Sequence, residues 1–346
     1  MTHQVCILPG DGIGPEVISQ AELVLKALKL DISFTRADIG FSAYEKWGTP
    51  LPDATLKSIQ EADATLFGAV TTPPAIPGYF SPIVRMRQVL DLYANLRPCR
   101  SFAHPSSRPG VDLIIVRENT EGLYSGAERM EQDGAHAGRE RAVSERIITR
   151  YASERIIHKA FELARQEHRQ KVTVVHKANV LRLTCGLFRQ VALEVAESYP
   201  EIRLEEMLVD TCAMELVRAP EQFDIIVTTN LFGDILSDEA SMLVGGLGVA
   251  YSGNIGECKA VFEPVHGSAP DIAGQHKANP TAAFLSAAML LEYLGETDPA
   301  ARLRHSIACC MARNEVTCDL GGALTTEQMT EQVLNELNWL REACKG

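Results

Sequence analysis

The stretch Phe223–Glu239 reads FDIIVTTNLFGDILSDE and joins a short apolar run to two closely spaced aspartates. The apolar, β-branched residues at its start predict a buried strand, residues 230–233 a turn, and the remainder a helix. On that helix Asp234 and Asp238 are four residues apart, so their carboxylates project from one face.

Two like charges at this spacing most often lie on a solvated helix face, because they repel each other. Here the neighbouring residues are apolar, and the pair follows the C-terminal end of a strand, where α/β proteins bind ligands. Paired carboxylates in that place suit a hard divalent cation. The stretch therefore predicts a metal site in an α/β protein.

The composition is ordinary for a globular protein: 346 residues, of which 46% are hydrophobic and 23% charged. The length favours two domains or one large one. A formal charge of −12 argues against nucleic acid or an anionic membrane as the main partner. We expect no signal peptide and no membrane helix, because no basic–apolar start and no run of roughly 20 apolar residues occurs. Nine cysteines without a CxxC pair indicate reduced thiols in a cytoplasmic protein.

A glycine-rich turn, PGDGIGPE at residues 9–16, follows the first expected strand. The dinucleotide fingerprint is G-x-G-x-x-G, whereas these glycines fall at positions 10, 12 and 14, and Pro15 opens the next helix. We therefore expect a tight strand–helix turn near a ligand cleft and no Rossmann phosphate loop.

Apolar runs and amphipathic segments alternate along the rest of the chain. The expected elements include a helix at 82–93, a loop or exposed arm at 126–142, a helix at 145–168, and a strand at 203–209 with Asp210 at its tip. Glycines between 245 and 256 suggest a crossing between domains.

Arg87, Arg97 and Arg117 all lie near the ends of expected elements. Each alone is more often a surface arginine, but together they offer forked donors to a substrate with several carboxylates. Tyr124 and Lys177 are ordinary residue types, yet Lys177 ends an apolar strand. A partly desolvated lysine beside a metal can transfer protons near neutral pH. These groups together indicate oxidation of a hydroxy acid next to a carboxylate.

Five motifs are spread over the whole chain: GDGIGPE at 10–16, DLYANLRP at 91–98, RENTEG at 117–122, NLFGDILSD at 230–238 and HGSAPD at 266–271. In these motifs and their order the chain resembles the β-decarboxylating dehydrogenases, the family of isocitrate, isopropylmalate, homoisocitrate, D-malate and tartrate dehydrogenases. The resemblance implies an isocitrate/isopropylmalate dehydrogenase-like fold, two α/β domains with a cleft between them, which differs from the Rossmann fold. Residues 1–98 and 247–346 would form a large NAD-binding domain. Residues 99–246 would form a small domain for dimerisation, metal binding and catalysis.

The resemblance also implies roles for single residues. Tyr124 would protonate the enol carbon, and Lys177 would take the hydroxyl proton. Mg²⁺ or Mn²⁺ would be bound by Asp234 and Asp238 of one subunit and by Asp210 of the partner subunit, which would also supply Lys177 and Asn179. The substrate contacts would be Ser81, Val84, Arg87, Arg97, Arg117 and Asn179. The cofactor contacts would be Thr71, His266, Gly267, Ser268, Ala269, Pro270, Asp271, Ile272 and Asn279.

The residues after the HGSAP motif favour NAD over NADP. NADP-dependent members resemble Lys-Tyr there, whereas this chain has Asp271-Ile272. A carboxylate accepts hydrogen bonds from a ribose hydroxyl and repels a 2′-phosphate.

The segment before Arg87 favours one substrate. Isocitrate members resemble Ser-x-Asn there and isopropylmalate members Gly-Leu-Leu-x-Leu-Arg, whereas this chain has Ser81-Pro82-Ile83-Val84. That segment, with Pro77–Phe80 and Leu123-Tyr124, is similar to the homoisocitrate branch. We therefore expect a homodimer, or dimer of dimers, with shared active sites that converts homoisocitrate to 2-oxoadipate, CO₂ and NADH in lysine biosynthesis by the aminoadipate route.

Other readings stay open. An NAD-dependent isocitrate dehydrogenase and a 3-isopropylmalate dehydrogenase are the nearest alternatives. A non-catalytic regulatory subunit is disfavoured because Tyr124, Lys177 and the three aspartates are all present. A pure nucleotide-binding protein is disfavoured by the glycine spacing.

Overall fold

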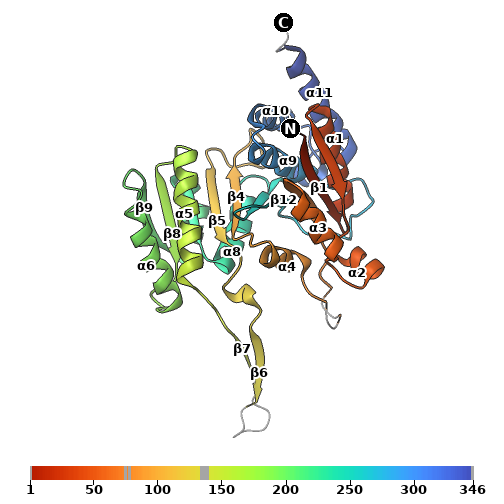
Figure 1. Ribbon diagram of the computed structural model, residues 1–346. Coiled ribbons are helices and arrows are strands. Elements are labelled where there is room, and N and C mark those ends of the chain that lie inside the picture. Colours follow the sequence, from red (N-terminus) through yellow and green to blue (C-terminus); the bar gives the residue numbers. More distant parts are fainter. Residues whose placement is uncertain (1, 74–75, 77–78, 133–139, 344–346) are drawn as a thin grey trace. The chain divides into compact units, whose positions relative to one another are not determined.

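A computed structural model describes residues 2–73, 76, 79–132 and 140–343 (Figure 1). The chain forms two compact units: unit 1 comprises Met1–Leu92, Leu96–Val111 and Ala240–Gly346, and unit 2 comprises Tyr93–Asn95 and Asp112–Glu239. Strand β4 (Ala94–Arg100) begins in unit 2 and continues in unit 1. The predicted domain limits at residues 98 and 246, with the roles given to each domain, stay a prediction.

The sheet of unit 1 is built around β1 (His3–Gly10), which pairs in parallel with β2 (Ile32–Arg36) and β3 (Ala64–Ala69). Strand β3 pairs in parallel with β12 (Ala260–Pro264), and β12 pairs in the antiparallel sense with β11 (Tyr251–Ile255). Every residue of β3 and β12 is buried, as in sheets that are covered on both faces.

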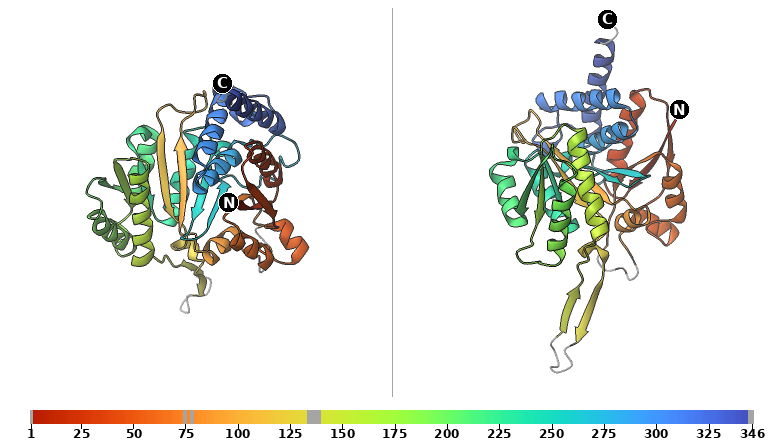
Figure 2. Two further views of the ribbon diagram at one scale, coloured as in Figure 1. Left: turned by 45° about the horizontal axis from the view of Figure 1, so that its top comes forward. Right: turned by 60° about the vertical axis from the view of Figure 1, so that its left-hand side comes forward.

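The helices of unit 1 form two groups. Helices α1 (Gly14–Ala27) and α9 (Thr281–Tyr293) pack on the sheet, and α10 (Thr297–Ala312) and α11 (Thr326–Ala343) pack on them (Figure 2). Almost the whole of α9 is buried, which explains its lack of a polar face. The other group is α2 (Phe41–Trp47), α3 (Asp53–Glu61) and α4 (Pro82–Val89). Helices α3 and α4 share a core with β1 and β3, and α2 contacts β1.

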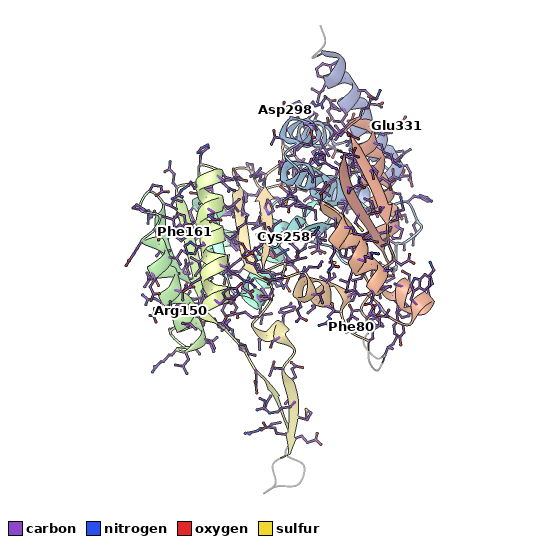
Figure 3. All side chains as sticks on the ribbon, in the orientation of Figure 1. Phe80, Arg150, Phe161, Cys258, Asp298 and Glu331 are labelled. Atoms are coloured by element: carbon purple, nitrogen blue, oxygen red, sulfur yellow. The ribbon has the colours of Figure 1, made fainter. Side chains whose placement is uncertain are left out.

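Unit 2 contains a parallel sheet in which β10 (Ile225–Thr228) lies between β5 (Asp112–Glu118) and β8 (Lys171–His176), and β9 (Arg203–Leu208) follows β8. Helix α5 (Arg150–Gln166) packs on three of these strands and beside α6 (Thr184–Ala196). Phe161 of α5 is fully buried and stacks on Tyr199, whereas Arg150 at the start of α5 is ion-paired with Glu194; Figure 3 labels Phe161 and Arg150. Helices α7 (Val209–Arg218) and α8 (Asn230–Met242) follow β9 and β10.

A two-stranded antiparallel hairpin, β6 (Glu128–Gln132) and β7 (Glu140–Ser144), extends away from the sheet of unit 2 (Figure 1). Its exposed ion pairs join Arg129 and Arg141 to Glu131. The expected loop or arm at 126–142 is thus an arm with regular pairing, and residues 133–139 lie outside the described residues.

Several expected element limits are wrong. Residues 230–233 are the first turn of α8 and not a separate turn, because the Gly233 N–H already donates to the Thr229 carbonyl at 2.9 Å. Asp210 lies in the first turn of α7, since β9 ends at Leu208. The helix expected at 82–93 ends at Val89, where Asp91 adopts a positive φ of 46° and β4 begins soon after. The helix expected from 145 begins at Arg150, capped by the Thr149 hydroxyl.

Across the ranges that the structure describes, no helix combines the length and the apolar character that a membrane span requires.

Candidate functional site

Arg117 and Asp234 form an ion pair between β5 and α8 of unit 2. Arg117 comes from the end of β5 and is 1% exposed, and its guanidinium donates to an Asp234 carboxylate oxygen of α8. The same guanidinium donates twice to Asn230 Oδ1, at 3.0 Å from Nε and 2.7 Å from Nη2. The Asn230 amide in turn donates to the Glu121 carbonyl at 3.1 Å. The first turn of α8 is therefore tied to the end of β5 by charged and polar bonds.

Gly233 makes this close approach possible. A Cβ atom at position 233 would lie 2.7 Å from both Cβ and Cγ of Arg117. No ordinary side chain fits there, so the glycine of the NLFGD segment serves the contact between α8 and β5.

Tyr124 joins the same group from the 3₁₀ turn Leu123–Ser125. Its hydroxyl donates to the second carboxylate oxygen of Asp234, and the Arg117 guanidinium lies 5.1 Å from the centre of its ring. Burial raises the pKa of Tyr124, and the Asp234 carboxylate raises it further. The phenol therefore stays protonated at neutral pH, as a proton donor must.

Glu118 and Glu121 are buried beside this group and were not predicted as functional. The Glu118 carboxylate accepts bonds from the backbone N–H groups of Thr120 and Glu121. The Glu121 carboxylate accepts the N–H and hydroxyl of Thr149, yet burial raises its pKa to about 7. The sequence signal was the RENTEG run itself, which places both acids at the end of an apolar strand.

Lys177 follows β8, and its ammonium group lies 2.5 Å from the Asp210 carboxylate. The lysine pairing lowers the pKa of Asp210, which is therefore ionised at neutral pH. Asn179 lies two residues further along and is exposed. The predicted partner-donated group Lys177, Asn179 and Asp210 thus occupies one surface of unit 2.

The carboxylates of Asp234 and Asp238 are the described groups that fit a hard cation, because they stand four residues apart on α8 and offer oxygen ligands. Within the described residues of one chain, no three acidic, histidine or cysteine side chains gather as a metal-binding group. One chain therefore does not bring Asp210 to Asp234 and Asp238. That separation agrees with a cation that takes its remaining ligands from water, substrate or a second subunit.

In unit 1, Arg87 of α4 is 7% exposed and donates to Glu263 of β12 at 2.8 Å. The Asn254 amide donates to the same Glu263 oxygen at 2.7 Å. Glu263 and Asn254 were missed by the sequence analysis, although they orient the predicted substrate arginine. Arg97 is buried in β4. Of the three predicted substrate arginines, Arg87 and Arg97 belong to unit 1 and Arg117 to unit 2.

The start of α4 carries the predicted specificity residues. The Ser81 hydroxyl caps the helix by accepting the Val84 N–H at 3.5 Å. Ile83 packs against the core of unit 1, so it is not free to face a ligand. Val84 is half-buried and stands three residues before Arg87. Residues three apart lie on the same face of a helix, so Val84 is an apolar neighbour of Arg87.

The glycine-rich turn at 9–16 organises the predicted cofactor residues of unit 1. The Asp11 carboxylate accepts three backbone N–H groups, those of Phe41, Ser42 and Thr71, at 2.7 to 2.9 Å. The Thr71 hydroxyl lies 2.7 Å from the Ser268 hydroxyl. A Cβ at Gly12, whose φ is +58°, would lie 1.9 Å from the Ser268 carbonyl. The turn thus holds the loop that carries Ser268 through backbone contacts, and Asp11 is a hub that the sequence analysis missed.

The segment 265–280, which carries the predicted cofactor residues, is buried at Ser268 and at its C-terminal end and mostly exposed between them. Ser268 and Asn279 are buried, and the Asn279 amide donates to Asp319 at 3.0 Å. Gly267, Pro270 and Asp271 are exposed, while Ala269 has a positive φ of 37° and Ile272 is half-buried.

One feature of the loop fits a bound nucleotide, and another holds the loop in place. His266 Nε2 is buried without a hydrogen-bond partner among the described residues, and burial lowers the pKa of His266, so its ring is neutral. Glu16 of α1 tethers the loop, because its carboxylate accepts the Gly274 N–H and the Thr326 hydroxyl.

Comparison with known proteins identifies this arrangement. The family described as Isocitrate/isopropylmalate dehydrogenase matches residues 4–333. The isocitrate/homoisocitrate dehydrogenase of Thermus thermophilus is 51% identical over 98% of this chain and 100% of its own length. The 3-isopropylmalate dehydrogenase of Methanothermobacter thermautotrophicus is 48% identical over 96% of this chain and 98% of its own. The crystal structure of isocitrate dehydrogenase from Methylococcus capsulatus matches with a TM-score of 0.93 at 45% identity, covering 97% of this chain and 99% of that one.

These matches confirm the predicted fold class, which is mixed α/β with a large parallel component. They also confirm the family that the five motifs indicated. The chain belongs to the isocitrate/isopropylmalate dehydrogenase family of β-decarboxylating dehydrogenases.

Proposed function

We propose that the protein oxidises homoisocitrate with NAD and releases CO₂, giving 2-oxoadipate and NADH. The observation that carries the reaction type is the Tyr124–Asp234–Arg117 group, which holds a protonated phenol against a carboxylate that suits a metal. The family is one of nicotinamide-dependent dehydrogenases that need a metal and act on small carboxylates.

Asp234 and Asp238 would hold Mg²⁺ or Mn²⁺, with Asp210 of the partner subunit as a further ligand. When bound, the cation would withdraw electrons from the new keto group as CO₂ departs. NAD would accept the hydride from the hydroxyl-bearing carbon of the substrate. The residues that would hold NAD are Thr71, Asn279 and the loop residues His266–Ile272.

The residues of the chain would then move two protons. Lys177 takes the hydroxyl proton during oxidation, and it can do so only after its ammonium group has lost its own proton. In one chain the Lys177 ammonium group is paired with the Asp210 carboxylate at 2.5 Å. Drawing Asp210 onto the metal of a second subunit would remove that pairing. Tyr124, whose phenol is protonated at neutral pH, donates the later proton to the enol carbon.

Asp271 supports NAD as the cofactor. It is exposed on the loop, and its carboxylate would accept hydrogen bonds from a ribose hydroxyl and repel a 2′-phosphate. The Asp271→Lys variant should therefore lose much of the preference for NAD over NADP, as ratios of kcat/KM for the two cofactors would report.

Val84 supports homoisocitrate as the substrate. Arg87, Arg97 and Arg117, with Ser81 and Asn179, would bind the carboxylates and hydroxyl. Val84 offers no donor to the distal carboxylate of isocitrate, which is one methylene shorter than homoisocitrate. Poorly paired buried polar groups cost about 1–3 kcal/mol, so homoisocitrate should be preferred by at least roughly tenfold.

Two relatives favour other substrates and define the alternatives. The Methylococcus capsulatus structure is that of an isocitrate dehydrogenase, and the Methanothermobacter thermautotrophicus relative is a 3-isopropylmalate dehydrogenase. Measuring kcat/KM for homoisocitrate, isocitrate and 3-isopropylmalate with NAD, with and without chelator, tests the proposal. A wild-type preference for isocitrate would leave the family assignment standing and overturn the substrate.

The Val84→Arg variant tests the residue behind that preference. Its new donor should shift the kcat/KM ratio toward isocitrate. Val89→Arg is the matched control, because Val89 is an exposed residue of the same helix. An equal shift in both variants would exclude a specific role for Val84.

We further propose a cytoplasmic homodimer, or dimer of dimers, that acts in lysine biosynthesis by the aminoadipate route. Unit 2 exposes three apolar residues near Lys177 and Asp210 in sequence: Val180, Leu183 and Met214. Apolar residues that a second subunit covers would be exposed in this way in a single chain. Mixing inactive Lys177→Met and Asp234→Asn subunits should restore activity, because one site of a mixed dimer is intact. No recovery after verified subunit exchange would mean that each site lies within one chain.

A further inference from the structure

A pocket of about 410 Å³ opens in unit 1 between the end of β2, the end of α2 and the start of α3. Its lining includes Asp38, Trp47, Thr49, Pro52, Asp53 and Ser58, and none of these belongs to the predicted substrate, cofactor or metal residues. The volume is in the range of small-molecule sites. The pocket therefore requires an explanation of its own.

Trp47 gives the pocket an aromatic wall that the fold does not bury. Trp47 is the last residue of α2 and is 57% exposed. Its indole N–H donates to Asp38 Oδ2 at 2.8 Å, which fixes the ring beside a carboxylate. A fixed, exposed indole next to a negative charge is a recognised arrangement for binding cations.

Lys46 shows that an ammonium group fits this arrangement. Its Nζ lies 2.9 Å from Asp38 Oδ2 and 4.7 Å from the centre of the Trp47 ring. The lysine side chain is 59% exposed, so little packing holds it in place. Asp38 Oδ1 accepts no hydrogen bond from the residues that the structure describes, and it keeps its capacity for a second donor.

Carboxylates outnumber guanidinium and ammonium groups among the residues that line the pocket. Asp38 and Asp53 contribute two carboxylates, and the Lys46 and Trp47 donors lower the pKa of Asp38, so that group is ionised at neutral pH. The lining guanidinium, that of Arg36, is already paired with Glu22. No described residue donates to the Asp53 carboxylate. The pocket thus presents negative charge to a ligand.

We propose that this pocket binds a small organic cation with a primary ammonium group on an aliphatic chain. The ammonium would be held by Asp38 and Asp53 through charge-assisted hydrogen bonds and by the face of Trp47 through a cation–π contact. The aliphatic part would lie along Pro52 and the methyl group of Ala54, which also line the pocket. An anion would meet two carboxylates, and a neutral polyol would leave the Asp53 carboxylate without a charged partner.

Tryptophan fluorescence gives a local test, because the chain has two tryptophans. The Trp339→Phe variant leaves Trp47 as the sole reporter, and Trp339 lies on α11, away from the lining residues in sequence. We would titrate the full-length variant at constant ionic strength with 1,5-diaminopentane, 1,5-pentanediol and glutarate, which share a five-carbon chain. A saturable change is expected with the diamine and not with the diol or the diacid.

Three substitutions in the Trp339→Phe background connect that signal to the lining residues. Asp38→Asn and Asp53→Asn should each weaken diamine binding by about tenfold, since each removes a charged acceptor. Lys46→Gln should strengthen it, because the internal ammonium competes for Asp38. Glu61→Gln is the matched control: Glu61 is an exposed carboxylate at the end of α3 and does not line the pocket.

Absence of saturable binding by the diamine would overturn the proposal, as would equal binding of the diol or diacid. An unchanged affinity in Asp53→Asn would also overturn it, and this variant keeps the test decisive if Asp38→Asn fails to fold. If Glu61→Gln lost as much affinity as Asp53→Asn, the diamine would be responding to the general surface charge. That result would also contradict a specific site in the pocket.

Discussion

The Arg117 group of unit 2 and the 265–280 loop of unit 1 are organised by different kinds of contact. In unit 2, Arg117, Tyr124 and Asp234 bond directly to one another through their charged or polar side chains. In unit 1, Glu16 accepts the Gly274 N–H of the loop, and Asp11 accepts the backbone N–H of Thr71, whose hydroxyl meets that of Ser268 in the loop. A substitution in unit 2 should therefore alter the reacting groups themselves, whereas one in unit 1 should alter where a loop lies.

The largest effects should follow loss of the proton carriers of unit 2. Lys177→Met should abolish oxidation, and Tyr124→Phe should slow turnover by about 10²–10⁴-fold, the usual cost of removing a positioned acid or base. Both should leave the KM for NAD nearly unchanged. Steady-state NADH formation would measure this, with Tyr151→Phe as the control because Tyr151 is an exposed tyrosine of α5. Full turnover by Tyr124→Phe would exclude it as the proton donor.

Asp234→Asn should combine two smaller effects. Removing one carboxylate should weaken Mg²⁺ or Mn²⁺ binding by at least roughly tenfold, which is already typical for loss of an outer ligand. It also leaves the buried Arg117 without its charged partner, at a cost of about 1–3 kcal/mol in the free energy of unfolding without metal.

Thermal unfolding with Mn²⁺ and with chelator separates these effects for Asp234→Asn. The wild type should gain stability from Mn²⁺ and the variant much less. Glu154→Gln, a change at a half-buried carboxylate of α5 that pairs with Arg150, should behave as the wild type. An identical response to Mn²⁺ in Asp234→Asn would remove this residue from the metal site.

Glu121 gives unit 2 a pH dependence that the loop of unit 1 does not share. Its pKa in the folded protein is about 7, above the ordinary value of 4.5. Its contribution to stability is therefore fully present below pH 4.5 and is lost as the pH rises through 7. Glu121→Gln should reduce this loss, by about 1–2 kcal/mol between pH 5 and pH 8. Denaturant unfolding at both pH values measures it, with Glu128→Gln as an exposed control; parallel curves for wild type and Glu121→Gln would contradict the buried, protonated state.

The sequence predicted unit 2 better than unit 1 for a physical reason. The spacing of Asp234 and Asp238 can be read directly, whereas the roles of Tyr124 and Lys177 came from the family resemblance, and the structure joins Tyr124 to Asp234. The boundary of α8 was missed because Asn230 looks like a turn residue, while in the fold its side chain bonds Arg117. Asp11 and Glu263 were missed because their partners lie 30 to 176 residues away in the chain, and no local pattern reports such pairs.

Asp11→Asn is the mildest change and addresses unit 1. Asp11 Oδ2 accepts the Phe41 and Thr71 N–H groups, and Oδ1 accepts the Ser42 N–H. An asparagine keeps one acceptor oxygen and places an NH₂ group against a remaining N–H, so one charge-assisted bond is lost. Because Thr71 is only one of the three donors that Asp11 binds, the KM for NAD should rise by only roughly three- to tenfold.

Asp31→Asn is the control for Asp11→Asn, since Asp31 is an exposed carboxylate near β2 that accepts the Thr2 hydroxyl. The kcat at saturating NAD should stay within about twofold, because Asp11 orients a loop and touches no reacting atom. A fall in kcat as large as that of Tyr124→Phe would contradict the division between a charged reaction group in unit 2 and a backbone-held loop in unit 1.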